Sequence, residues 1–89
     1  MGPATNADES TNDRELTFGE KAVGLTFNPS SDVRVDNIKR KFADAIDVLQ
    51  TLRGSTDPSQ GEVTRMLSVA ITEAKTAQMW AVKAATWDN

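Results

Sequence analysis

"TLRGSTDPSQGEV", residues 51–63, decides the fold, because it separates two long segments whose apolar residues recur with a helical period. Gly54 is a natural helix terminator, and Ser55-Thr56 forms the loop. Asp57-Pro58-Ser59-Gln60 then supplies an N-cap, a proline at the first helical position and a capping-box glutamine. A connection this short makes the two helices antiparallel. The stretch therefore predicts an all-α fold built on an antiparallel two-helix hairpin.

The segment before this turn predicts an amphipathic helix that begins at a cap provided by Ser31 or Asp32. Its apolar residues are spaced 3, 4, 3, 4 and 3 apart, which is a heptad seam. The seam consists of Val35, Ile38, Phe42, Ala45, Leu49 and Leu52, and it is widened by Ile46 and Val48.

The segment after the turn predicts a second helix from about Ser59 to Thr86. Its seam is rich in alanine, whose small side chain lets the partner helix approach closely, and Gly61 slightly weakens its first turn. The seam residues are Val63, Leu67, Ala70, Ala74, Ala77, Ala81 and Ala84.

This second helix also carries large apolar residues outside its seam. They are Met66, Val69, Ile71, Met79, Trp80, Val82 and Trp87. One facing helix cannot cover so wide an apolar surface, and an exposed patch of this kind indicates an interface between copies of the chain. The alternative is that a short N-terminal helix folds back and covers the patch.

The piece that precedes the hairpin predicts such a helix. Thr17 followed by Glu20 has capping-box spacing, and Gly24 can end a helix over Phe18–Val23 in a left-handed conformation. A helix this short is not stable alone, so it must dock against something. Residues 25–27, Leu-Thr-Phe, alternate as an extended segment does, and residues 28–30, Asn-Pro-Ser, predict a turn.

Length and composition limit the remaining choices. The 89 residues form one domain, with residues 1–14 as a disordered arm and residues 15–88 as the folded part. The absence of cysteine and histidine excludes disulfides and thiolate metal sites, and it removes the commonest general base. The net charge of −3 argues against binding to DNA or RNA polymers. With neither a membrane-length apolar run nor a signal core, we expect no membrane partner and a cytoplasmic location.

The residues do not indicate an enzyme, a metal site or a cofactor. Neither a Walker sequence nor a GxGxxG pattern occurs. Asp44 and Asp47 are near neighbours on a helix, and a solvated face is the simplest interpretation. The same interpretation fits residues 39–41, Lys-Arg-Lys, because successive helical residues point about 100° apart and cannot all face one ligand.

Three other residues indicate a small phosphorylated ligand that carries a base. Arg34 lies in the first turn of its helix, and Lys21 and Phe18 lie on the short helix. If they converge, a cation, an aromatic ring and free amides at a helix start would be available together. The alternative is that Phe18 and Phe27 are core residues.

"ELTFGEKAVGLTFNPS" (15–30) and "AITEAKTAQMWAVKAATW" (70–87) together resemble the bacteriophage anti-CBASS sponge family, whose hairpin domain is shared with anti-Thoeris sponges. The resemblance implies a compact homohexamer that does no chemistry. It implies that the chain binds cyclic dinucleotides and cyclic trinucleotides at separate sites between protomers. In the host bacterial cytoplasm, it would withhold these messengers from the effectors that kill the infected cell.

The resemblance also implies roles for particular residues. Phe18 matches an aromatic residue that stacks on the bases, and Arg34 is the nearest candidate for a basic residue that meets the phosphates, with Val33 as the other possible match. Ser31 stands where the family commonly has glycine, which bears on the trinucleotide site most. Asn28 and Ser30 are polar residues that would line the site.

A second function from a different class stays open. The exposed Met and Trp side chains of the last helix could bind an amphipathic helix of another protein, with the phenylalanines in the core. A monomer or dimer in solution would favour this protein-interaction module, whereas a closed hexamer would not.

Overall fold

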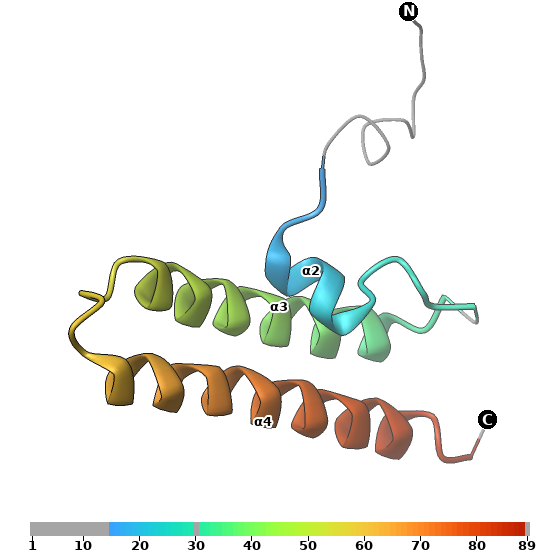
Figure 1. Ribbon diagram of the computed structural model, residues 1–89. Helices are drawn as coiled ribbons and strands as arrows, with labels where there is room; N and C mark the ends of the chain where they lie inside the picture. The colour runs from blue at the N-terminus through green and yellow to red at the C-terminus, as the bar shows by residue number, and fades with distance from the viewer. Residues whose placement is uncertain (1–14, 30, 89) are drawn as a thin grey trace, which may run out of the picture.

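The computed structural model describes residues 15–29 and 31–88, and these form three α-helices. Helices α3 (Val33–Gly54) and α4 (Gly61–Ala85) run antiparallel, and α2 (Phe18–Val23) packs mainly on α3 (Figure 1). The described residues include no strand. The predicted all-α hairpin with a short N-terminal helix is therefore confirmed, while the predicted arm over residues 1–14 lies outside the described residues.

Helix α2 has the bounds and both ends that its sequence predicts. The Glu20 amide donates to Thr17 Oγ1 at 3.1 Å, and the Thr17 amide donates to Glu20 Oε1 at 2.9 Å, which completes the capping box. Gly24 ends the helix with φ of 62°. The Leu25 amide then turns back to the Glu20 carbonyl at 3.0 Å, as in a Schellman motif.

The segment after α2 is a turn, so the predicted extended segment over residues 25–27 is wrong. The Schellman bond holds Leu25, and the Phe27 amide donates to the Gly24 carbonyl at 2.9 Å. These two bonds keep the backbone folded back on the helix end. A second turn follows, in which the Ser31 amide donates to the Asn28 carbonyl at 3.0 Å. The turn predicted from the Asn-Pro-Ser sequence is therefore confirmed.

Helix α3 begins at a predicted cap residue, whereas α4 begins later than predicted. Asp32 caps α3, as one of the two predicted residues. Asp57 caps a turn and not a helix, because its carboxylate accepts from the Ser59 amide at 2.8 Å and its carbonyl accepts from the Gln60 amide at 2.8 Å. Helix α4 consequently begins at Gly61, two residues later than expected, with no side-chain cap.

The core lies where all three helices meet, on a face of α3 that is turned by one position from the predicted seam. Its members are Val23, Ala43, Ile46 and Ile71. Ile46, which the sequence pattern placed at the widened edge of the seam, is fully buried, and Ile71, which the pattern placed outside the seam, belongs to the core. Four predicted seam residues are instead exposed, namely Ala45, Leu52, Ala77 and Ala84. For the two residues of α3, the reason is that this helix has to face α2 as well as α4.

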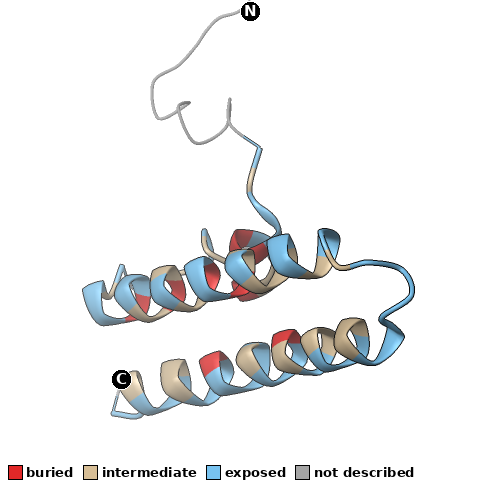
Figure 2. Ribbon diagram, turned by 90° about the vertical axis from the view of Figure 1, so that its left-hand side faces the viewer, coloured by how far each residue is buried: buried red, intermediate tan, exposed pale blue. Residues whose placement is uncertain are grey.

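The outer face of α4 stays uncovered. Figure 2 shows the buried residues of α4 on the side that faces α3 and exposed residues along the opposite side. Met79, Trp80 and Trp87 are 63%, 66% and 71% exposed. The alternative that the short helix covers this face is wrong, because α2 packs mainly on α3. None of the three described helices combines the length and apolarity that crossing a bilayer requires.

Candidate functional site

A glycine contact fixes α2 on α3. A Cβ atom at Gly19 would lie 2.1 Å from the carbonyl oxygen of Ala43, so only glycine allows the two helices to approach this closely. The Gly19 amide donates to Asp47 Oδ1 at 2.7 Å. Asp47 is thus an anchor for α2, and its interpretation as part of a solvated face is wrong. This crossing sets the position of the adjacent Phe18 ring.

An ion pair supports the same contact. Glu20 is buried, and its Oε2 accepts from Arg40 Nη1 at 3.0 Å. Asp44 lies 3.6 Å from the same nitrogen. The hydrogen bond to Glu20 raises the pKa of Arg40. Arg40 is therefore committed to holding α2, and its charge is already balanced by carboxylates.

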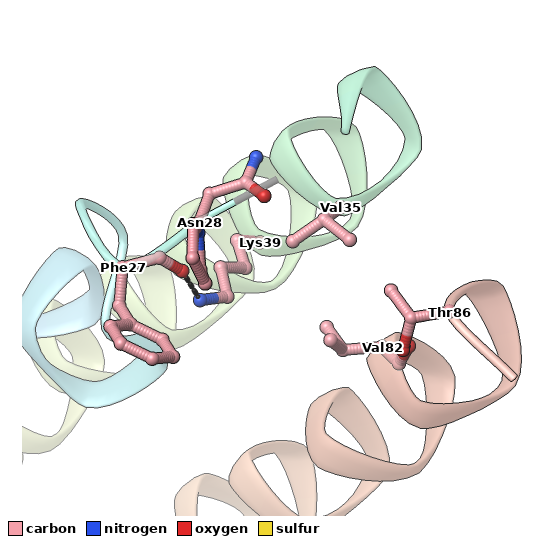
Figure 3. Close-up of a pocket in the computed structure, with 7 residues that line it drawn as sticks. Phe27, Asn28, Val35, Lys39, Val82 and Thr86 are labelled. Atoms are coloured by element: carbon pink, nitrogen blue, oxygen red, sulfur yellow. Dashed lines mark hydrogen bonds between the residues drawn. The ribbon is translucent and has the colours of Figure 1, made fainter. Parts of the chain in front are cut away.

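Lys39 binds the backbone of the connection between α2 and α3. Only 5% of it is exposed, and its Nζ donates to the Gly24 carbonyl at 2.9 Å and to the Phe27 carbonyl (Figure 3). Nζ also lies 5.4 Å from the centre of the Phe27 ring. Burial lowers the pKa of Lys39. The solvated-face interpretation is therefore wrong for this lysine, which is an internal tether.

A cavity of about 250 Å³ opens beside this tether, between the α2–α3 connection and the end of α4 (Figure 3). Its lining is largely apolar, and the Thr86 hydroxyl that borders it already donates to the Val82 carbonyl at 2.8 Å. The lining residues are Phe27, Asn28, Pro29, Val35, Lys39, Val82 and Thr86. The described residues hold no cluster of acidic side chains suited to a metal ion.

Polar side chains at the start of α3 form a closed network. Asn28 Nδ2 donates to the Asp32 carbonyl at 3.0 Å and to Asp36 Oδ1 at 2.8 Å. Arg34 donates to both carboxylate oxygens of Asp32, through Nε at 3.2 Å and Nη2 at 2.9 Å. This bond to the guanidinium lowers the pKa of Asp32 from 3.8 to about 2. The Arg34 charge is therefore neutralised by its neighbour.

This network makes a testable prediction about pH. Because the folded-state pKa of Asp32 is below its unfolded value, its contribution to stability is complete at neutral pH and is lost as the pH falls through about 2. We expect Arg34→Ala to raise the Asp32 pKa towards 3.8, since the guanidinium is the main cause of the shift. Carboxyl-carbon NMR titration of both proteins measures this directly. An unchanged Asp32 pKa in the variant would contradict the pairing.

The Phe18 ring lies at the opposite end of α2 and is 41% exposed, while Phe27 is 71% exposed. The alternative that both rings are core residues is therefore wrong. The guanidinium carbon of Arg53 lies 5.7 Å from the centre of the Phe18 ring. Arg53 belongs to the last turn of α3 and also reaches α4, where its Nη1 donates to Ser68 Oγ at 2.9 Å. Lys21 is exposed one turn further along α2.

The model of the Acb2/Tad1 hairpin domain matches residues 20–86, which is most of the chain. The chain belongs to this family. It is the family of anti-CBASS and anti-Thoeris sponges, so the resemblance noted in the sequence is confirmed. Its members are proteins that bind cyclic oligonucleotides and are not known as enzymes. Searches of curated proteins and of solved structures found no match.

In this Acb2/Tad1 hairpin, the predicted site residues form two groups. Phe18 and Lys21 lie on α2, with Phe18 towards the C-terminal end of α3, whereas Asn28, Ser31 and Arg34 surround the start of α3. The helical rise of about 1.5 Å per residue separates Arg34 from the Asp47 anchor by about 20 Å along α3. One protomer therefore does not bring Phe18 and Arg34 together.

The amides at the helix starts are also occupied in this hairpin. The Gly19 amide donates to Asp47, and the Glu20 amide donates to Thr17. The Arg34 amide donates to Asp32 Oδ1 at 2.8 Å. The idea that free amides at a helix start meet a phosphate is therefore wrong for these three groups. Ser30 lies outside the described residues.

Ser31, at the position where the resemblance led us to expect a glycine, has φ of 53°. This is the left-handed conformation, which glycine adopts without the steric cost that a Cβ atom brings. Ser31 adopts this conformation with its side chain exposed.

The sequence did not identify Arg53 as a candidate. Its proximity to Phe18 depends on where α2 docks along α3. The spacing of apolar residues within either helix does not predict this position. The only available signal was Gly19, which indicates a close helix contact without naming the partner residue.

Proposed function

We propose that the chain binds and sequesters cyclic oligonucleotide messengers without degrading them. Cyclic dinucleotides such as cyclic GMP-AMP are the main ligands, and cyclic trinucleotides are the second class. The observation that carries this proposal is membership of the sponge family over residues 20–86. Tight binding lowers the free messenger by mass action, so bacterial anti-phage signalling is blocked with no need for turnover. The protein would act in the host bacterial cytoplasm during phage infection.

We further propose that the ligand sites lie between protomers of a homohexamer. Phe18 sits beside the Asp47 anchor, which is about 20 Å along α3 from Arg34, so a site that uses both Phe18 and Arg34 needs two chains. Exposed apolar side chains are available for such contacts on both long helices. They are Val48 and Leu52 on α3, and Met66, Val69, Met79 and Trp80 on α4, with Trp87 just beyond its end.

Calorimetric titration with cyclic GMP-AMP and with cyclic tri-adenylate, beside light scattering for mass, tests both statements. We expect a hexameric mass and tight binding of the dinucleotide, with one ligand per pair of chains as a two-fold interface requires. Chromatography of the ligand released by denaturation should recover it intact. No binding heat with either ligand would overturn the proposal.

A substitution identifies the stacking residue. Phe18→Ala should weaken dinucleotide binding by about 1–3 kcal/mol for each base that stacks on the ring, which is about 5-fold to 150-fold in Kd. The melting temperature and the mass should stay unchanged, because the ring is half-exposed and outside the core.

Phe27→Ala is the matched comparison, since Phe27 is also exposed but lies at the other end of α2. We expect it to bind the dinucleotide as the unchanged protein does. A loss of affinity with Phe27→Ala and none with Phe18→Ala would mean that the wrong ring has been assigned.

The exposure of Met79, Trp80 and Trp87 is the observation that favours the second function, a module that binds a partner helix. The two functions differ in the mass that they require. A monomer with this face open and no ligand heat would select the interaction module, whereas a ligand-binding hexamer would select the sponge.

A further inference from the structure

The described arginines differ in how their charge is balanced. Three of them pair with carboxylates: Arg34 with Asp32, Arg40 with Glu20 and Asp44, and Arg65 with Glu62. Arg53 instead donates to Ser68 Oγ and to the amide oxygen of Gln50, which are both neutral. Within residues 15–29 and 31–88, Arg53 is thus the arginine whose charge no carboxylate balances.

Arg53 is also the arginine beside the exposed aromatic ring. Its guanidinium carbon lies 5.7 Å from the centre of the Phe18 ring, within the range of a cation–π contact. Side chains from all three helices meet here, because Phe18 belongs to α2, Arg53 to α3 and Ser68 to α4. The guanidinium is therefore held in place before any ligand arrives, which reduces the entropy lost on binding.

The remaining donors of Arg53 suit a phosphodiester. A guanidinium has five N–H donors in a planar fork that matches phosphate oxygens. Ser68 Oγ accepts one hydrogen bond from Nη1, and Gln50 Oε1 accepts one from Nη2. The other N–H groups of the guanidinium remain available to a phosphate. Arg34 would first have to give up its two bonds to Asp32, so it is a poorer phosphate ligand at the same ionic strength.

We propose that Arg53 contacts the phosphodiester of a cyclic oligonucleotide whose base stacks on Phe18. This inference rests on the proposed sponge function and deepens it. It places a cation for this base within one protomer, next to the stacking ring, whereas Arg34 of the same protomer is paired with Asp32 at the distant α3 cap. Lys21, exposed on the same side of α2 as Phe18, adds positive charge nearby.

Titrations of cyclic GMP-AMP at several salt concentrations test the proposal. Arg53→Gln should weaken binding by about tenfold or more. It should also make the slope of log K against log salt less steep, because a contact between opposite charges that salt screens is lost. Arg53→Lys keeps the charge but not the planar fork, so the slope should be restored while the affinity is restored only in part.

Two further variants separate a ligand contact from a structural role. Arg65→Gln removes an exposed arginine that is paired with Glu62, and it should change neither Kd nor slope. Ser68→Ala removes the anchor of Arg53 on α4 but keeps its charge, so the slope should stay unchanged. If Arg53→Gln does not fold, the Arg53→Lys variant decides alone. Weaker ligand binding by Arg53→Lys, with the same salt slope as the unchanged protein, would support the contact. An unchanged Kd of Arg53→Lys would overturn the contact.

The other outcomes are also distinct. Binding by the unchanged protein, with an unaltered Kd or an unaltered salt slope in Arg53→Gln, would overturn the role of Arg53 and leave the sponge function standing. Absence of binding by the unchanged protein to both cyclic GMP-AMP and cyclic tri-adenylate would overturn the sponge function, and the role of Arg53 with it.

Discussion

Replacing Gly19 by alanine is expected to detach α2 from the hairpin. The new Cβ would lie 2.1 Å from the Ala43 carbonyl oxygen and 2.9 Å from Asp47 Oδ1. The Ala43 carbonyl is part of the backbone of α3 and cannot move aside, so α2 has to shift. A six-residue helix has no stability of its own and should unfold once it is displaced.

The displacement would remove several contacts together. Glu20 would leave Arg40, the Gly19 amide would leave Asp47, and Val23 would leave the core. Overpacking alone costs about 1–3 kcal/mol and occasionally more, and we expect Gly19→Ala to reach the upper end of this range. Ligand binding at Phe18 should be lost as well, because the ring is placed by the same crossing.

Urea unfolding and hydrogen exchange over residues 17–27 measure these effects. Gly61→Ala is the control, because no atom lies within 4 Å of its added Cβ. Since alanine favours a helix by up to about 1 kcal/mol over glycine, this control should be as stable as the unchanged protein or slightly more so. Equal stability and equal exchange in Gly19→Ala and in the unchanged protein would show that α2 does not dock in this way.

Local signals in the sequence were sufficient for both ends of α2 and for the start of α3. The Thr17–Glu20 capping box, the left-handed Gly24 and the Asp32 cap each depend on residues a few positions apart, and each is present. The Asp57–Gln60 motif failed for a local reason too. Its aspartate satisfies the Ser59 amide inside a turn, and this delays the start of α4.

The face that α3 buries could not be predicted from its periodicity alone. A heptad seam assumes one partner helix, and α3 has two, so the buried face is wider and is centred on Ala43 and Ile46. Lys39 shows the same limit. Lys39 is buried because the carbonyl groups in the turn after α2 need a hydrogen-bond donor. The sequence of residues 33–54 alone does not indicate this need.

The candidate site was predictable in part. Phe18 stands in a recognisable position of the sequence and its ring is exposed, while its stacking role stays a prediction. The choice of Arg34 as its cation followed from nearness in the sequence, and the structure pairs that arginine with Asp32 instead. Arg53 is far from Phe18 in the sequence and near it in space because α2 folds back along α3.

Ile46→Ala should cause the second large effect, a loss of about 2–5 kcal/mol in the free energy of unfolding. Ile46 is fully buried and belongs to the cluster that joins Val23 of α2, Ala43 of α3 and Ile71 of α4. Alanine would leave a cavity at the point where the three helices meet. A small domain is stabilised by only about 5–15 kcal/mol in total, so this loss is a large fraction of it.

Leu52→Ala is the matched control, since leucine and isoleucine are isomers and both residues lie on α3. Leu52 is 52% exposed although the heptad pattern places it in the seam, so its truncation should cost far less than that of Ile46 in the isolated chain. Unfolding should be measured at several chain concentrations, because an interface through Leu52 would make its effect grow with concentration. Equal losses from the two variants at the lowest concentration would mean that α3 turns its heptad seam to the core and that the three-helix cluster centred on Ile46 is wrong.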